Sequence, residues 1–253
     1  MQQQNIPIVL IHGLGGFDVL FKHRRPSREY FPGVRQHLES YGYRVLMPRL
    51  SGTGSVRNRA MELRAILHRE LGTTPAHLVG HSMGGLDARY LITRLGFGEQ
   101  ALSLTTIGCP HRGSVIADWA MKYFGRACAQ MMRRLGLCAD AFADLTTTAC
   151  SEFNAVTPDL PGVRYFSIAG VIDRPWMAPI WRWPSTQLNR VDGANDGVVS
   201  VTSATWGEST ELWQADHLNL VNWPNERMRK VGEWNDRAPH YRALLSRMNT
   251  PAH

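Results

Sequence analysis

The stretch from Thr74 to Tyr90 places the strongest constraint on how this chain can fold. A short apolar run leads into Gly80-His81-Ser82-Met83-Gly84, and a helical pattern follows, which predicts a strand, a tight turn and a helix. In this context Gly-x-Ser-x-Gly is typical of a strained turn that lifts a serine hydroxyl above a sheet. Small flanking residues are needed because the strand and the helix cross closely. Ser82 is therefore the candidate nucleophile, and the competing interpretation is a glycine-rich turn with an incidental serine.

Strands are expected to alternate with helices along the rest of the chain. Apolar runs predict strands at residues 6–11, 44–47, 102–107, 163–168 and 211–213, besides the run before Ser82. Helical patterns occur at residues 32–41, 55–71, 117–154, 217–222 and 239–249, and tryptophans among prolines at 176–183 indicate a loop. This order predicts an α/β fold with a mostly parallel sheet flanked by helices. Neither repeats nor a low-complexity linker interrupt it, so residues 1–253 are expected to form one domain.

Two of the expected helices carry specific signals. Pro32 suits the first position of its helix, with Val34, Leu38 and Tyr41 on the inner face. Ser55 is the candidate N-cap of the next helix. Its inner face follows helical spacing through Val56, Ala60, Leu63, Leu67 and Leu71.

A nucleophilic serine needs a base within hydrogen-bond reach and a third group that fixes the tautomer of that base. In the fold that carries this turn, the acid and then the histidine follow the serine along the chain. Four histidines follow Ser82: His111, His217, His240 and His253. His217 is the candidate base because it follows the last predicted strand; a core histidine, or a neighbour of a helix N-cap, is the alternative interpretation.

Asp196 is the candidate for the third group. It lies in Gly193-Ala194-Asn195-Asp196-Gly197, a glycine-flanked loop before the last strand, from which a carboxylate can turn towards His217. Three other aspartates compete for this role: Asp173, Asp192 and Asp216. The alternative for Asp196 itself is an Asx turn.

Ester chemistry at a serine also needs two N–H donors for the developing oxyanion. The residue after the nucleophile, Met83, supplies one candidate, and the loop after the first strand supplies the other. In His12-Gly13-Leu14 the glycine frees the backbone to approach a substrate, so the Leu14 N–H is the second candidate.

Several motifs in this order and spacing carry a family resemblance. They are Ile11-His12-Gly13-Leu14-Gly15-Gly16-Phe17-Asp18, Gly80 to Gly85, Cys109-Pro110-His111-Arg112-Gly113-Ser114, Asn195-Asp196-Gly197 and Asp216-His217-Leu218. Together they resemble the bacterial triacylglycerol lipases of the Pseudomonas and Burkholderia type, within the α/β-hydrolase fold. The resemblance covers nearly the whole chain, and weaker similarity continues through Tyr30-Phe31-Pro32-Gly33 and Tyr165-Phe166-Ser167.

The resemblance implies roles residue by residue. It implies a triad of Ser82, Asp196 and His217, with Leu14 and Met83 as oxyanion donors. It also implies that residues 114–160 form a helical insertion at the position of the family's lid, and the apolar surplus of 117–154 suits a lid over an acyl pocket. Ordinary core helices are the alternative.

One departure from the family concerns metal. The family's calcium site uses an aspartate two residues after the catalytic histidine, whereas this chain has the neutral Asn219 there. A hard cation with fewer carboxylates binds weakly. The sequence therefore predicts no metal and no cofactor.

Charge and composition limit the partners. The net charge is +7, but basic residues are spread along the chain without a run that interleaves with aromatics, so no nucleic-acid partner is expected. An ester or lipid substrate is expected, with the tryptophans of 176–183 as candidates for contact with a lipid–water interface. The oligomeric state is not indicated.

The start of the chain and its cysteines carry weaker signals. Residues 1–5 have no basic or apolar signal region, which favours a cytoplasmic location for the chain as written, or a secreted one if a signal was removed. The cysteines Cys109, Cys128, Cys138 and Cys150 lack metal-site spacing, and either one local disulfide or buried free thiols would fit them.

These features predict a serine hydrolase that cleaves carboxylic esters of lipids through an acyl-enzyme. The alternatives are a short-chain carboxylesterase or polyester hydrolase, an acyltransferase on the same triad, and a non-catalytic lipid carrier on this fold.

Overall fold

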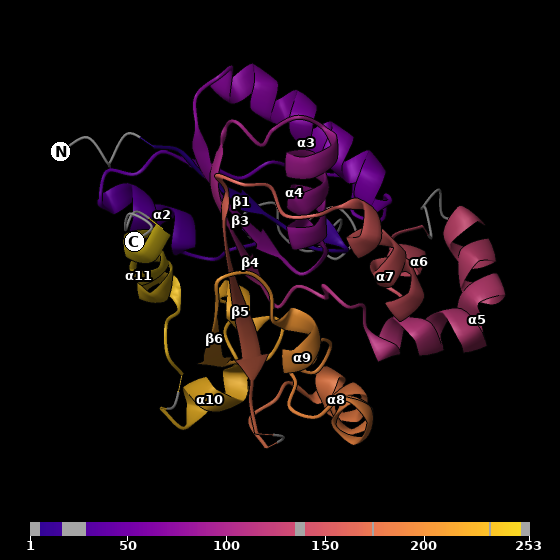
Figure 1. The fold of residues 1–253 in the computed structure, drawn as a ribbon. Helices are drawn as coiled ribbons and strands as arrows, with labels where there is room; N and C mark the ends of the chain where they lie inside the picture. The colour runs from indigo at the N-terminus through magenta and orange to yellow at the C-terminus, as the bar shows by residue number, and fades with distance from the viewer. Residues whose placement is uncertain (1–5, 17–28, 135–139, 174, 233, 249–253) are drawn as a thin grey trace.

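The computed structural model describes residues 6–16, 29–134, 140–173, 175–232 and 234–248. Within these residues six strands form one sheet in the order β2-β1-β3-β4-β5-β6, and each neighbouring pair is parallel (Figure 1). The strands are β1 (Ile8–Ile11), β2 (Val45–Leu46), β3 (Ala76–His81), β4 (Ala101–Ile107), β5 (Arg164–Val171) and β6 (Ser209–Gln214). The predicted parallel α/β sheet is therefore confirmed.

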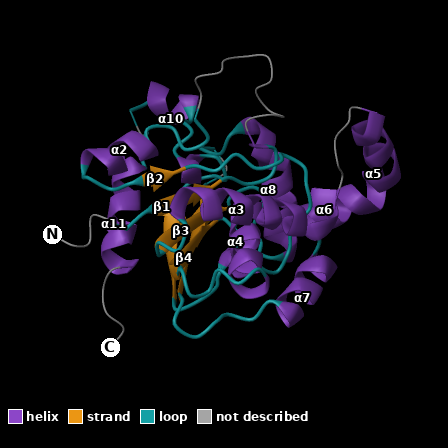
Figure 2. Ribbon diagram, turned by 90° about the horizontal axis from the view of Figure 1, so that it is seen from above, coloured by secondary structure: helices purple, strands orange, loops and turns teal. Residues whose placement is uncertain are grey.

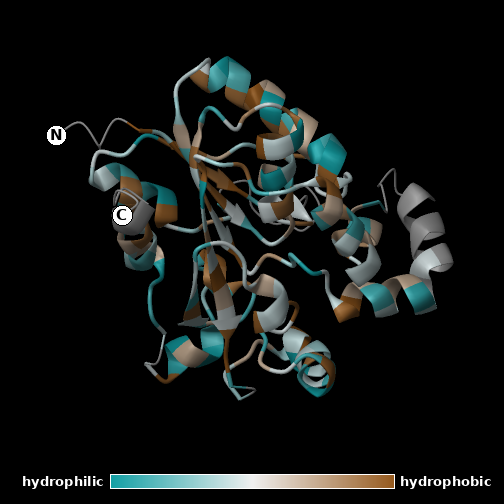
Figure 3. Cartoon of the chain, in the orientation of Figure 1, coloured by the Kyte–Doolittle hydropathy of each residue, from teal (hydrophilic) through white to brown (hydrophobic). Residues whose placement is uncertain are grey.

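Helices cover both faces of the sheet. Figures 1 and 2 show α2 (Val34–Ser40) beside α11 (Ala238–Met248) on one face, and α3 (Val56–Leu71) beside α4 (Met83–Arg94) on the other. Neighbouring strand residues point to opposite faces, so a strand covered on both sides must be apolar at every position. In β1, Ile8 and Leu10 join the core under α2 and α11, while Val9 and Ile11 join the core under α3 and α4. The apolar strands at the centre of Figure 3 reflect this arrangement.

The helix expected after Ser55 forms as its pattern predicts. The Ser55 side chain accepts a hydrogen bond from the Asn58 N–H at 3.2 Å, which satisfies a donor of the first turn. The five predicted inner residues are all buried. Each buried leucine contributes about 1.5–3 kcal/mol to the free energy of unfolding. The fully buried Arg59 on the same face was not predicted.

Two other helices differ from prediction at their ends. The helix expected from Pro32 begins at Val34, with Gly33 as its N-cap at φ 73°. Tyr41 follows the last residue of this helix and is 38% exposed, so the prediction that Tyr41 lies on the inner face is wrong.

Near the C-terminal end of the chain, the helix predicted over 217–222 is replaced by a shorter 3₁₀ helix, η2, which covers Asn219–Val221. The short α10 (Glu226–Lys230) was not predicted.

The loop predicted at residues 176–183 is wrong in its second half. A helix, α8 (Pro179–Val191), begins there and contains Trp181 and Trp183. Pro179 is the first residue of this helix, where the missing N–H would have no intrahelical partner anyway. Pro184 lies inside the helix, where a proline removes one backbone hydrogen bond. The prolines therefore led to the prediction of a loop, whereas Pro179 is the residue at which the helix begins.

Residues 114–160 form a helical excursion between β4 and β5. Its helices are α5 (Val115–Arg134), α6 (Asp140–Asp144) and α7 (Thr147–Val156), and Figure 1 shows α5 furthest from the sheet. A core cluster joins Met83 and Cys109 to Ala141, Leu145 and Cys150 of this excursion. Part of this segment therefore belongs to the hydrophobic core, and its action as a lid remains a prediction.

A buried polar cluster at His111 fastens α7 to the sheet. The ring Nε2 lies 2.9 Å from Thr106 Oγ1, and Nδ1 lies 3.3 Å from Arg89 Nη1. Arg89 also donates to Asn154 Oδ1 at 2.8 Å and to the Thr157 carbonyl at 2.9 Å. The Asn154 amide donates to the His111 carbonyl at 2.8 Å, which closes the cluster.

His111 makes the stability of the fold depend on pH. Burial lowers the pKa of His111 well below 6.5, and the charges of Arg89 and Arg112 lower it further. The unfolded chain gains this proton as the pH falls below about 6.5 while the folded chain does not, so stability is lost in that direction. We expect His111→Gln to remove this dependence, since an amide can still donate to Thr106.

The measurement is the free energy of unfolding in urea between pH 5 and 7.5 for both proteins. The wild type should lose up to about 1.4 kcal/mol per pH unit below 6.5 relative to the variant. Parallel curves for the two proteins would show that His111 takes up its proton equally in the folded state. The comparison with the variant cancels the pH dependence of every other titrating group, because both proteins contain those groups.

Two of the four cysteines lie within the described residues together with their side chains. Cys109 and Cys150 are buried free thiols, whereas Cys138 and the side chain of Cys128 lie outside the described residues. A disulfide that involves those two stays untested. None of the described helices has the length and apolar character needed to cross a membrane.

Candidate active site

The candidate nucleophile lies at the turn between β3 and α4. Every residue of β3 is buried, and the strand ends directly before Ser82, whose φ of 52° lies in a region that only glycine adopts readily. A Cβ on Gly80 would lie 2.7 Å from the Gly84 carbonyl oxygen, and one on Gly84 would lie 2.6 Å from the Ile11 oxygen. The predicted strand, turn and helix are present, and both glycines are needed for this close crossing.

The candidate base and acid are joined directly. His217 Nδ1 lies 2.7 Å from Asp196 Oδ2, and both side chains are buried. The other oxygen, Asp196 Oδ1, accepts from the backbone N–H groups of Val198 at 2.9 Å and Val199 at 2.8 Å. The carboxylate is therefore fixed in orientation, and a proton on His217 Nδ1 is favoured, which leaves Nε2 as the basic nitrogen.

The surroundings of His217 restrict its ring. The centroid of the His81 ring lies 4.6 Å away, and that of Trp181 in α8 lies 6.3 Å away in an edge-on arrangement. A Cβ on Gly108 would lie 3.0 Å from Asp196 Oδ2 and 3.4 Å from His217 Nδ1. Gly108, at φ 53°, therefore leaves the space in which the two side chains meet, and no motif in the sequence indicated this.

The competing acids have other partners. Asp216 accepts three backbone N–H bonds, from Ala178 at 3.0 Å, Leu218 at 3.1 Å and Asn219 at 2.9 Å. Burial raises the pKa of Asp216, and these hydrogen bonds oppose that rise because they stabilise the carboxylate. Asp192 accepts from the Ser200 hydroxyl, and Asp173 is exposed. The structure therefore brings Asp196, and not these rivals, to His217.

The two candidate oxyanion donors come from neighbouring segments. A Cβ on Gly13 would lie 2.8 Å from Ser82 Cβ, so the loop that carries Leu14 runs against the candidate nucleophile. The Leu14 side chain packs against the cluster that contains Met83. Met83 is the first residue of α4, where the N–H has no acceptor within the helix. The loop that carries Leu14 and the first turn of α4 therefore both lie beside Ser82, and the role of the two N–H groups as oxyanion donors stays a prediction.

An unpredicted buried ion pair supports this loop. Arg59 Nε donates to Asp87 Oδ2 at 2.9 Å, and Arg59 Nη2 and Nη1 each donate at 2.6 Å to the carbonyls of His12 and Ser51. Burial raises the pKa of Asp87 to about 6, and the charge of Arg59 and its hydrogen bond to the carboxylate limit this rise. A charged residue on the inner face of a predicted helix was the only sequence signal for this pair.

The side-chain nitrogen of Asn219 binds the neighbouring backbone. Asn219 is 3% exposed, and its amide nitrogen donates to the Trp223 carbonyl at 2.8 Å. Among the described residues, no group of three or more His, Cys, Asp or Glu side chains could hold a metal ion. The expectation of an activity without metal or cofactor stays a prediction.

Comparison with known proteins identifies the family of the chain. The profile described as "Alpha/beta hydrolase family" matches residues 8–250. Triacylglycerol lipase 2 of Saccharomyces cerevisiae is 38% identical over 210 residues, which cover 78% of this chain and 64% of that protein. The triacylglycerol lipase of Pseudomonas fragi is 32% identical over 263 residues, which cover 85% of this chain and 87% of that one.

Solved structures share the fold at lower identity. The lipase BlEst2 of Bacillus licheniformis in its mature form has a TM-score of 0.72 at 22% identity, covering 96% of this chain and 92% of that chain. A metagenomic carboxyl esterase has a TM-score of 0.74 at 23% identity, covering 85% of this chain and 65% of that chain. The chain belongs to the α/β-hydrolase family, in the group that includes the bacterial triacylglycerol lipases.

Proposed function

We propose that this protein hydrolyses carboxylic esters of lipids through an acyl-enzyme on Ser82. The observation that carries the proposal is the 2.7 Å hydrogen bond between Asp196 and His217, buried at the same end of the sheet as the strained turn at Ser82. A serine hydroxyl is a poor nucleophile unless a base takes its proton, and a histidine fixed by a carboxylate is such a base.

The proposed reaction gives each of the candidate residues one role. The Ser82 oxygen attacks the ester carbonyl while His217 Nε2 takes the hydroxyl proton, and the negative oxygen formed is held by the N–H groups of Leu14 and Met83. His217 then gives its proton to the leaving alcohol, which leaves Ser82 acylated. A water molecule, deprotonated by His217, attacks the acyl group, and the carboxylic acid leaves as Ser82 regains its proton.

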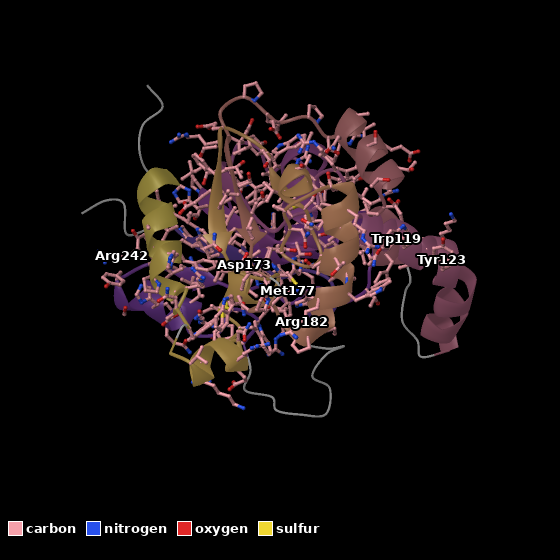
Figure 4. The ribbon with its side chains drawn as sticks, turned by 90° about the horizontal axis from the view of Figure 1, so that it is seen from below. Trp119, Tyr123, Asp173, Met177, Arg182 and Arg242 are labelled. Atoms are coloured by element: carbon pink, nitrogen blue, oxygen red, sulfur yellow. The ribbon has the colours of Figure 1, made fainter. Side chains whose placement is uncertain are left out.

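Apolar surface beside the site supports a lipid substrate. On α8, Ile180 is 68% exposed and Trp183 is 64% exposed, and on α5 Tyr123 is 67% exposed. The ring centroids of Trp119 and Trp183 lie 6.1 Å apart, which joins the two helices, and Figure 4 shows Trp119 between α5 and α8. Exposed aromatic side chains in one region are typical of surfaces that meet lipid or another protein.

We assign this surface to the lipid–water interface, with residues 114–160 as the covering segment over the acyl site. Trp181 of α8 contacts the His217 ring from within the same helix that exposes Trp183. The named activities of the relatives, which are triacylglycerol lipases, support the same substrate class.

We expect the preference for acyl chains to separate a lipase from a short-chain esterase. Each buried CH₂ stabilises the bound chain by about 0.8 kcal/mol, so an apolar trough should raise kcat/KM as the chain lengthens until the trough is full. The measurement is a series of p-nitrophenyl esters from C2 to C16, with emulsified triglyceride in parallel.

The Ser82→Ala variant supplies the background in the same series. A maximum at C8 or beyond with cleavage of triglyceride supports the lipase. A maximum at C2–C4 without triglyceride cleavage would favour the short-chain carboxylesterase and leave the roles of Ser82, Asp196 and His217 unchanged.

A further inference from the structure

A continuous line of buried hydrogen bonds runs behind the candidate site through two side chains that the reaction above does not use. The Gly13 N–H donates to the Tyr30 hydroxyl oxygen at 3.0 Å. The Tyr30 oxygen lies 2.8 Å from His81 Nδ1, and His81 Nε2 lies 3.0 Å from the His217 carbonyl oxygen. Tyr30 and His81 are 6% and 0% exposed, so no link of this line is exchanged readily with water.

The partners fix the direction of every hydrogen bond in the line. The backbone N–H of Gly13 can only donate, and the carbonyl of His217 can only accept. Because the His217 carbonyl accepts from His81 Nε2, neutral His81 carries its proton on Nε2, and its Nδ1 accepts from the Tyr30 hydroxyl. Burial lowers the pKa of His81 well below 6.5, and the charge on a protonated His217 lowers it further. His81 therefore stays neutral while His217 gains a proton.

The line joins three segments that are far apart in sequence. Gly13 precedes Leu14, whose N–H is one proposed oxyanion donor, His81 precedes the nucleophile, and His217 is the base. The His81 ring also lies 4.6 Å from the His217 ring and 5.7 Å from the Tyr30 ring. Any shift of the Gly13 loop relative to His217 must therefore break or bend one of these buried hydrogen bonds, and a buried polar group left without its partner disfavours the shifted arrangement.

We propose that Tyr30 and His81 are positioning residues that hold the Leu14 oxyanion donor and the backbone of His217 at one fixed separation. The inference rests on the proposed function, since it concerns the reaction at Ser82. Oxyanion donors act only when they lie within hydrogen-bond distance of an oxygen that forms in the transition state. The two side chains therefore affect the transition state more than the binding of substrate.

The first test compares two tyrosine variants that each lose a buried acceptor for a backbone N–H. Tyr30→Phe removes the acceptor of Gly13, and the control Tyr165→Phe removes the acceptor of the Leu160 N–H, which lies 3.1 Å from the Tyr165 oxygen. Tyr165 is also 6% exposed but lies in β5, outside the site. Rates are divided by the fraction of enzyme that a fluorophosphonate titrates, so that unfolded protein does not enter the comparison.

We expect Tyr30→Phe to lower kcat about 10- to 100-fold with KM changed less than about twofold, because a misplaced donor acts on the transition state. The inhibition constant of a trifluoromethyl ketone, which forms an oxyanion on a serine, should rise by the same factor. Tyr165→Phe should lower the melting temperature and leave both constants near those of the wild type. Equal kinetics for the two variants would overturn the proposal.

The second test divides the line at His81. In His81→Asn the side-chain oxygen can still accept from the Tyr30 hydroxyl, but the side-chain nitrogen cannot reach the His217 carbonyl. In His81→Gln the longer side chain can donate to the His217 carbonyl, but it cannot accept from the Tyr30 hydroxyl. Each should lower kcat by about 10-fold or more. Tyr30→Phe should lower kcat by a smaller factor in the His81→Gln protein than in the wild type, because the hydrogen bond between Tyr30 and residue 81 is already lost there.

The outcomes separate this inference from the proposed function. A wild-type protein that hydrolyses no ester contradicts the function before the variants are compared. If the wild type is active and the factors by which the two single variants lower kcat simply multiply in the double variant, the positioning role of Tyr30 and His81 is contradicted. The proposed roles of Ser82, Asp196 and His217 are unaffected by that result.

Discussion

Replacing Ser82 with alanine is expected to lower kcat for ester hydrolysis by about 10⁶-fold, which is the loss found when a serine nucleophile is removed from a triad. No acyl-enzyme can form without the hydroxyl, and the remaining activity comes from the oxyanion donors and substrate binding. The fold should survive, because alanine removes one oxygen from a side chain that is 6% exposed. The measurement is the hydrolysis of a p-nitrophenyl ester, with the melting temperature recorded for the same preparation.

A matched control is Ser103→Ala. Ser103 is fully buried on β4 and its hydroxyl lies 2.8 Å from His77 Nδ1, away from the candidate site. This variant should lose stability because the buried hydrogen bond to His77 Nδ1 is lost, and its folded fraction should keep its kcat. Substantial activity in Ser82→Ala, in a preparation free of wild type, would mean that another residue is the nucleophile.

Replacing Asp196 with asparagine is expected to lower kcat by about 10⁴-fold, as in other triads whose acid is made neutral. The Oδ2 atom that accepts from His217 Nδ1 at 2.7 Å would be replaced by an oxygen or an NH₂ group without charge. The amide no longer selects the Nδ1–H tautomer and no longer stabilises protonated His217. KM should change little, because Asp196 lies behind the base and is 1% exposed.

The rival acids provide the controls for this variant. Asp173→Asn changes an exposed side chain, and Asp192→Asn changes the acceptor of the Ser200 hydroxyl, so both should keep kcat within a few-fold of the wild type. If either of them loses activity by orders of magnitude while Asp196→Asn does not, the acid has been assigned to the wrong residue.

The features predicted from sequence depend on local patterns. The strands were visible as apolar runs because β1 and β3 are buried on both faces. Ser55 was recognisable as an N-cap because capping is a contact over three residues. The turn at Ser82 could be predicted because it needs glycines at fixed spacing, and the partners Asp196 and His217 followed from the chain order that this turn imposes.

The features missed by sequence analysis depend on contacts between distant segments. Arg59 is 28 residues from Asp87, and Tyr30 is 51 residues from His81, so no local pattern identifies the partner in either pair. Gly108 was not singled out because its role appears only once Asp196 and His217 meet beside it. The helix α8 was missed because prolines that indicate loops on average can also begin a helix.

The central claim is that Ser82 is the nucleophile, and covalent trapping tests it most directly. A fluorophosphonate reacts with an activated serine and leaves a stable phosphonyl group on its oxygen. We expect the intact mass of the active wild type to rise by one phosphonyl group per chain, with the label on the peptide that contains Ser82 and activity lost in proportion. A label on any other residue, or an unlabelled protein that still hydrolyses esters, would contradict this assignment.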